Sequence, residues 1–146
     1  MFSMSYSITL RVYQTNPGRG FFHIVEQTVW NYANGGTWSE ANGALTLTMG
    51  GSGTSGVLRF LSDKGELITV AVGVHNYKRW CDTVTGLRPG ETALLINGQY
   101  YNNGGRDWVR ELQQSEHSAT SPTGTTAKVV YTVTEGNKLE ANVIFE

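Results

Sequence analysis

Residues 68–74 read Ile-Thr-Val-Ala-Val-Gly-Val, and this stretch decides the fold. Ile68, Val70, Val72 and Val74 alternate with polar or smaller residues. Because successive side chains of a β-strand point to opposite faces, this period of two predicts a strand with one β-branched, apolar face.

Similar segments lie on both sides of this stretch along the chain. Alternation or short apolar runs predict further strands over residues 7–14, 21–30, 45–49, 57–61, 128–134 and 139–145. Gly, Asn and Pro separate them, and these residues favour turns. The segment Glu135-Gly136-Asn137-Lys138 fits the connection of a terminal hairpin. Many short strands joined by such turns predict a mainly β fold, a single-domain β-sandwich of two sheets covering residues 1–146.

One segment departs from the period of two. Tyr77, Trp80, Cys81 and Val84 are spaced i, i+3, i+4 and i+7, which is typical of one face of a helix. Asn76 precedes them as an N-cap residue would. We therefore expect a short helix here, directly after the strand at 68–74.

The region after this segment is less regular. A second short helix is expected over residues 107–114, whereas residues 93–101 fit either a strand or a loop.

Composition excludes several classes of function. Charged residues make up 16% of the chain, and the formal net charge is -1, so the basic footprint of a nucleic-acid-binding protein is missing. The single cysteine, Cys81, permits no intrachain disulfide, and no signal-peptide pattern or run of about 20 apolar residues is present. We expect a cytoplasmic protein without a nucleic-acid partner and without membrane insertion.

A glycine-rich loop at Gly51-Ser52-Gly53-Thr54-Ser55-Gly56 matches G-x-G-x-x-G. A dinucleotide site requires a helix to follow this motif, but the apolar run at 57–61 predicts a strand. The loop is either a plain turn or a place where bare backbone N–H groups and the Ser52 hydroxyl meet a closely approaching ligand.

Signals of catalysis are weak. Cys81 lies in the apolar stripe and is expected to be a buried small residue instead of a nucleophile. The three histidines lack partners at metal-ligand spacing, and no pair of acids stands out as a glycosidase pair would. We expect no enzyme activity, no metal and no cofactor.

The polar residues around the expected helix suggest a different chemistry. His75 and Asn76 mark its start, while Asp82 and Thr85 are three residues apart and would be neighbours on its surface. Planar amides and carboxylates bind neutral sugar hydroxyls, and aromatic rings cover the C–H faces of sugars. Alternatively, Asn76 is only a helix cap and Asp82 only a solvated acid.

Long collinear blocks strongly resemble the fungal fruit-body lectins of mushrooms and boletes. The resemblance runs from about Met4 to Glu146, and Met1-Phe2-Ser3 looks like an extension. The blocks that carry it are Arg11-Val12-Tyr13-Gln14-Thr15, Tyr32-Ala33-Asn34-Gly35-Gly36-Thr37-Trp38, residues 47–56 (LTMGGSGTSG), residues 73–82 (GVHNYKRWCD) and residues 131–137 (YTVTEGN).

This resemblance implies an actinoporin-like β-sandwich of two sheets joined by a short helix-containing connection. It also implies a homotetramer and two separate carbohydrate sites per subunit that bind glycans of glycoproteins. One site would bind Galβ1-3GalNAc, the Thomsen-Friedenreich antigen, and the other N-acetylglucosamine. The first site maps to Ala33, Ser52, Gly53, Asn76 and the adjacent His75. The second site maps to Asp82, Thr83, Thr85, Arg106 and position 117, where this chain has His117 and the family usually has Tyr.

Two other functions are alternatives to sugar binding. The fold is similar to that of pore-forming actinoporins, which insert an amphipathic N-terminal helix, but residues 7–14 alternate as a strand. An enzyme acting on glycans is the other alternative, and the lack of an evident acid pair counts against it. A defensive role is implied only by resemblance to toxic relatives.

Overall fold

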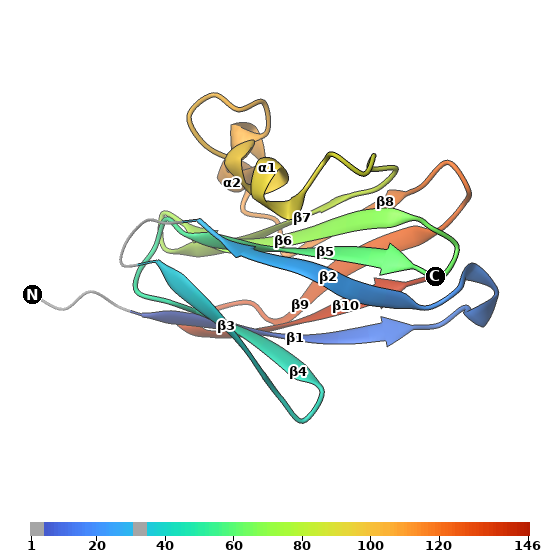
Figure 1. Ribbon diagram of the computed structural model, residues 1–146. Helices are drawn as coiled ribbons and strands as arrows, with labels where there is room; N and C mark the ends of the chain where they lie inside the picture. The colour runs from blue at the N-terminus through green and yellow to red at the C-terminus, as the bar shows by residue number, and fades with distance from the viewer. Residues whose placement is uncertain (1–4, 31–34) are drawn as a thin grey trace, which may run out of the picture.

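The computed structural model describes residues 5–30 and 35–146, which form two β-sheets packed face to face (Figure 1). One sheet has six strands in the order β3-β4-β1-β10-β9-β8, and the other has four in the order β2-β5-β6-β7. The strands are β1 (Tyr6–Gln14), β2 (Phe22–Val29), β3 (Gly36–Ala41), β4 (Ala44–Met49), β5 (Ser55–Ser62), β6 (Leu67–His75), β7 (Lys78–Val84), β8 (Glu116–Thr120), β9 (Thr126–Val133) and β10 (Lys138–Phe145). The mainly β, two-sheet fold expected from the sequence is confirmed.

The six-stranded sheet joins the beginning and the end of the chain. β1 runs parallel to β10, with Ile8 opposite Leu139 and Val12 opposite Val143. β9 and β10 pair antiparallel, so the predicted terminal hairpin is confirmed. The expected alternation in the first strand is also confirmed, since Ile8 and Leu10 are fully buried.

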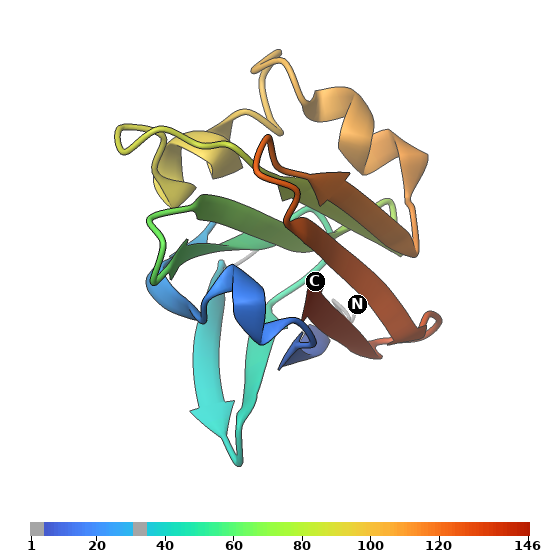
Figure 2. The same cartoon turned by 90° about the vertical axis from the view of Figure 1, so that its right-hand side faces the viewer.

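The four-stranded sheet is buried on both faces. Its inner face packs against the six-stranded sheet in a core that includes Phe60, Ile68, Val72 and Cys81. Its outer face carries Trp80 and other apolar residues that pack under two short helices. Both views show the helices lying over this outer face, while the β3–β4 hairpin extends away from it (Figures 1 and 2).

The helix expected over Tyr77–Val84 is wrong. Lys78–Val84 is strand β7, paired antiparallel with β6 from Thr69–Val84 to His75–Lys78. Trp80 and Cys81 are adjacent, yet each is fully buried because the strand is covered on both faces. Burial on both faces removes the polar half of the alternation, and what remains imitates the spacing of a helix face.

The helices lie later in the chain. α1 (Ala93–Gly98) begins after Thr92, whose side chain accepts a hydrogen bond from the Leu95 N–H as an N-cap. The strand or loop expected over residues 93–101 therefore has to be corrected to a helix over most of its length. α2 (Asp107–Leu112) confirms the second expected helix. Across residues 5–30 and 35–146, no helix is long and apolar enough to cross a membrane.

Two strands were not expected from the sequence, β3 and β8. Each lies at an edge of the six-stranded sheet, and their residues are mostly exposed or only half-buried. Edge strands with polar side chains carry a weak apolar period, which explains why the pattern missed them.

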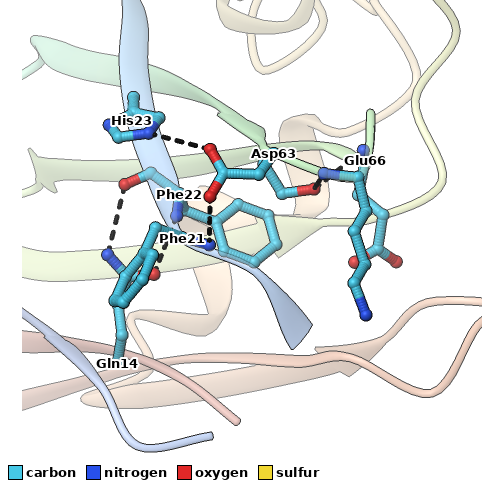
Figure 3. A network of polar contacts seen from close by, with 8 residues as sticks. Gln14, Phe21, Phe22, His23, Asp63 and Glu66 are labelled. Carbon is cyan, nitrogen blue, oxygen red and sulfur yellow. Dashed lines mark hydrogen bonds and ion pairs between the residues drawn. The ribbon is translucent and has the colours of Figure 1, made fainter. Parts of the chain in front are cut away.

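Side chains also bind the two sheets together at the end of β1 (Figure 3). The Gln14 amide accepts a hydrogen bond from the Phe22 N–H at 2.7 Å and donates to the Phe22 carbonyl at 3.2 Å. The Asp63 carboxylate accepts from the Phe21 N–H at 3.2 Å and lies 3.2 Å from His23 Nε2. These contacts fix β2 where the chain crosses from the first sheet to the second.

Close packing between β5, β6 and β7 leaves no room for a side chain at Gly73. A Cβ there would lie 2.7 Å from Trp80 Nε1 and 2.8 Å from the Thr54 carbonyl oxygen.

We predict that Gly73→Ala lowers the free energy of unfolding by about 1–3 kcal/mol, the range for overpacking a dense core. Gly90→Ala is the matched control, because a Cβ at that position meets nothing within 4 Å. Urea unfolding of both variants checks this, and equal midpoints would contradict it.

Candidate functional site

The β6–β7 hairpin closes with a two-residue turn. His75 and Lys78 are its last pair, and the residues between them, Asn76 and Tyr77, both have positive φ, 49° and 66°. Two consecutive left-handed residues define a type I′ hairpin turn, for which Asn is suited and Tyr is not. This chain nevertheless has Tyr77 at the second position of the turn, and the residue is 77% exposed. Such strained positions concentrate at functional sites.

The glycine-rich loop lies against this turn. The Tyr77 N–H donates to Ser52 Oγ at 3.0 Å, and the Gly53 N–H donates to the Val74 carbonyl at 2.8 Å. Gly53 has a φ of 101°, which other residues rarely adopt. The motif continues into β5 and not into a helix, so the dinucleotide interpretation lacks its required context.

Loop and turn form one side of a pocket of about 550 Å³. Four residues expected in the first sugar site line it, and the fifth, Ala33, lies outside the described residues. The pocket is lined by Trp30, Ser52, Gly53, His75, Asn76, Tyr77, Tyr101, Asn102 and Arg110. Sequence reasoning missed the other five residues. They come from the position after β2, from the β6–β7 turn, from the segment that follows α1, and from α2 itself. Only tertiary folding brings these parts of the chain together.

An aromatic pair forms a rigid part of this pocket. The Trp30 and Tyr101 rings stack with centroids 4.1 Å apart and an angle of 2° between their planes. Behind them, the Tyr101 hydroxyl lies 2.7 Å from Ser55 Oγ, which in turn donates to Asn97 Oδ1 at 2.8 Å. Burial raises the pKa of Tyr101 to about 12, so the hydroxyl stays protonated and the network is uncharged at neutral pH.

His75 is held between the turn and α2. Arg110 lies with a guanidinium nitrogen 3.1 Å from His75 Nδ1, and Gln113 donates to the His75 carbonyl at 2.7 Å. Burial lowers the pKa of His75, the Arg110 charge lowers it further, and Glu111 opposes both. The imidazole is therefore neutral at pH 7, with Nδ1 accepting from the arginine.

The second expected site is a separate cluster at the edge where β7 meets β8. The Asp82 carboxylate accepts from the Tyr100 hydroxyl at 2.6 Å. It also lies 3.4 Å from His117 Nε2 and 3.8 Å from the guanidinium of Arg106. Burial and the Asp82 carboxylate raise the pKa of Tyr100 well above its usual value, so this hydroxyl remains a donor.

The orientation of His117 follows from its second nitrogen. The Thr83 N–H donates to His117 Nδ1 at 3.1 Å, and the Thr83 hydroxyl lies 2.7 Å from the same atom. Because a backbone N–H can only donate, Nδ1 is the acceptor in this arrangement, and the ring proton is placed on Nε2, facing Asp82.

Four of the five residues expected in the second site are thus brought together: Asp82, Thr83, Arg106 and His117. Thr85 follows the end of β7 and is half-buried. Asp82 and Thr85 do not share a helix face, since the helix is absent. Tyr100 was missed, because an aromatic residue in a segment of uncertain structure carries no signal of a carboxylate partner.

Other candidate chemistry is not supported by its surroundings. Cys81 is buried, and burial raises the pKa of its thiol to about 12, so the reactive thiolate is suppressed. Within residues 5–30 and 35–146, no three His, Cys, Asp or Glu side chains gather as metal ligands would. The lining of the first pocket is instead dominated by uncharged hydroxyls, amides, backbone groups and aromatic rings.

Comparison with known proteins points to one family. The family model described as fungal fruit body lectin matches residues 4–143. The Boletus edulis lectin is 76% identical over 142 residues, covering 97% of this chain and 99% of that protein.

Solved structures agree with this match. The wild-type lectin of Xerocomus chrysenteron is 79% identical, superposes with a TM-score of 0.97 and covers 98% of this chain and 100% of its own. A mutated form of that lectin gives a TM-score of 0.98 at 78% identity, with 99% of each chain covered.

The lowered pKa of His75 has a consequence for stability. Between this pKa and the usual value of about 6.5, the unfolded chain binds more protons than the folded protein. The contribution of His75 is fully present above about pH 6.5 and is lost as the pH falls toward the folded pKa. We predict that His75→Gln shows a smaller fall in the free energy of unfolding between pH 7 and pH 5 than the wild type. Urea unfolding at several pH values measures this, and parallel pH profiles would contradict it.

Proposed function

Because the chain belongs to the fungal fruit body lectin family, whose members bind carbohydrate without catalysis, we propose that it binds two different sugars at its two clusters. The pocket at the β6–β7 turn takes Galβ1-3GalNAc, and the cluster around Asp82 takes N-acetylglucosamine. The observation that carries the proposal is the convergence of the turn, the glycine-rich loop and the aromatic pair on one pocket.

For the disaccharide, the proposed contacts are Ala33, Ser52, Gly53, His75 and Asn76. The Asn76 amide offers both donors and an acceptor to vicinal hydroxyls, and it is exposed at the turn. The half-buried Trp30, which stacks on the buried Tyr101 ring, supplies an apolar surface for sugar C–H groups. A pocket with these groups suits a neutral saccharide core.

For N-acetylglucosamine, the proposed residues are Asp82, Thr83, Thr85, Arg106 and His117. The side chains of Arg106 and His117 are 34% and 29% exposed, whereas that of Asp82 is 5% exposed. The first two therefore meet the ligand at the surface, and the carboxylate beneath orients them. His117 can stack and hydrogen-bond where the family usually has Tyr.

We also propose that several such sites act together in one assembly. Single contacts between a lectin and a sugar are weak, and linking several sites raises avidity by about 10²–10⁴-fold where the geometry permits. A homotetramer of chains with two sites each would cross-link glycoproteins and agglutinate cells.

The first site is tested at Asn76. Asn76→Gly removes the amide and keeps the positive φ of 49° accessible, whereas Ala would add strain to the turn. We predict that Asn76→Gly weakens Galβ1-3GalNAc at least about tenfold, since lost hydrogen bonds leave pocket groups unpaired. Calorimetric titration measures the change.

A matched control exists on the β3–β4 hairpin. Asn42 also lies in a two-residue turn with positive φ, 53°, and is followed by Gly43. Asn42→Gly is expected to bind the disaccharide like the wild type. Equal affinity of the Asn76 and Asn42 variants would refute the site.

The second site is tested at Arg106. We predict that Arg106→Ala weakens N-acetylglucosamine about tenfold or more, because it removes a charged donor from the surface of the cluster. Binding of Galβ1-3GalNAc should be retained, since Arg106 does not line that pocket. Titration with both sugars decides this, and an equal loss for both would count against two separate sites.

A further inference from the structure

One permanent charge lies in the lining of the first pocket. Among its described lining residues, Arg110 is the only charged side chain at neutral pH, since His75 is neutral there. Residues 31–34, whose placement is not described, read Asn-Tyr-Ala-Asn and add no charge from the sequence. The pocket therefore combines groups suited to a neutral sugar with a single cation.

Arg110 is held in a fixed orientation. Its Nε donates to the Tyr100 carbonyl at 2.5 Å, and one terminal nitrogen lies 3.1 Å from His75 Nδ1. The guanidinium carbon lies 4.6 Å from the centroid of the Tyr101 ring, a distance that allows a cation–π interaction. A guanidinium has five N–H donors, so these contacts leave donors available to a ligand.

No carboxylate is in ion-pair contact with Arg110 within the part of the chain that the structure describes. The ion pairs found there include Arg106 with Asp82 and Arg59 with Glu26, but none involves Arg110. The nearby Asp107 carboxylate senses the Arg110 charge without contacting it, because it accepts from the Asn103 N–H at 2.6 Å. Glu111 is exposed. A half-buried, oriented guanidinium that no carboxylate contacts directly is a favourable partner for an anion.

We propose that Arg110 is a specificity-determining residue that makes this pocket favour saccharides carrying an anionic substituent beside the galactoside. The shared chemistry is a planar or tetrahedral oxyanion, from the carboxylate of a sialic acid or from a sulfate ester. Both match the parallel N–H donors of a guanidinium. This inference rests on the proposed disaccharide site.

Titration of the wild-type protein with three probes tests the inference. The probes are Galβ1-3GalNAc, the same disaccharide with a sulfate on galactose, and the same disaccharide with a sialic acid on galactose. We expect at least one anionic probe to bind about tenfold more tightly than the neutral one at low salt. That advantage should shrink several-fold at about 0.5 M NaCl, because salt screens exposed charges. The two anionic probes distinguish sulfate from carboxylate.

Variants then identify the residue responsible. In Arg110→Gln, the ratio of anionic to neutral affinity should fall to about one, and in Arg110→Lys part of the ratio should survive with the charge. Arg88→Gln, which removes an exposed cation outside the pocket lining, should keep the wild-type ratio.

The outcomes separate this inference from the proposed function. Absence of binding to the neutral disaccharide by the wild type would reject the disaccharide site itself. Neutral binding with equal or weaker binding of both anionic probes would overturn only the role of Arg110. An unchanged ratio in Arg110→Gln would overturn it as well.

Discussion

Burial of the four-stranded sheet on both faces is the constraint on which both clusters depend. The inner face packs on the six-stranded sheet and the outer face packs under α1 and α2. β6 and β7 are therefore held on both faces, and their shared turn projects from this packed core. Helices packed on the outer face bring Tyr101 and Arg110 to the end of the sheet, where the turn lies. A site built this way is preorganised, which reduces the ordering that binding requires.

The two clusters both lie on this four-stranded sheet, but their chemistry differs. At the turn, a neutral histidine, an exposed amide and a stacked aromatic pair meet one guanidinium without a carboxylate partner. At the β7–β8 edge, a buried carboxylate is surrounded by a tyrosine hydroxyl, an imidazole and an arginine. In the second cluster, the Arg106 guanidinium lies beside the Asp82 carboxylate. In the first, no carboxylate of the described residues forms an ion pair with Arg110. Electrostatic selectivity is accordingly expected in the first pocket more than in the second.

The sequence predicted the architecture better than it predicted local structure at the site. Alternation in β1, β6 and the β9–β10 hairpin was sufficient to identify the sandwich. It failed at β7, where Trp80 and Cys81 are buried on opposite faces and leave no polar period. Resemblance identified Ser52, Gly53, His75 and Asn76, which do share a pocket. Trp30, Tyr101 and Arg110 could not be found because their positions depend on how the helices pack on the sheet.

The two clusters meet at neighbouring residues of the segment after α1. Tyr100 donates to Asp82 in the second cluster, while Tyr101 stacks on Trp30 in the first. Arg110 contacts both, through the Tyr100 carbonyl and the Tyr101 ring. A Tyr101 substitution therefore removes a ring that supports Trp30 and Arg110. A Tyr100 substitution removes the hydroxyl bound to Asp82 but keeps the backbone carbonyl that binds Arg110. Each tyrosine side chain thus supports its own cluster, and the two clusters are joined through the backbone of residues 100 and 101 and through Arg110.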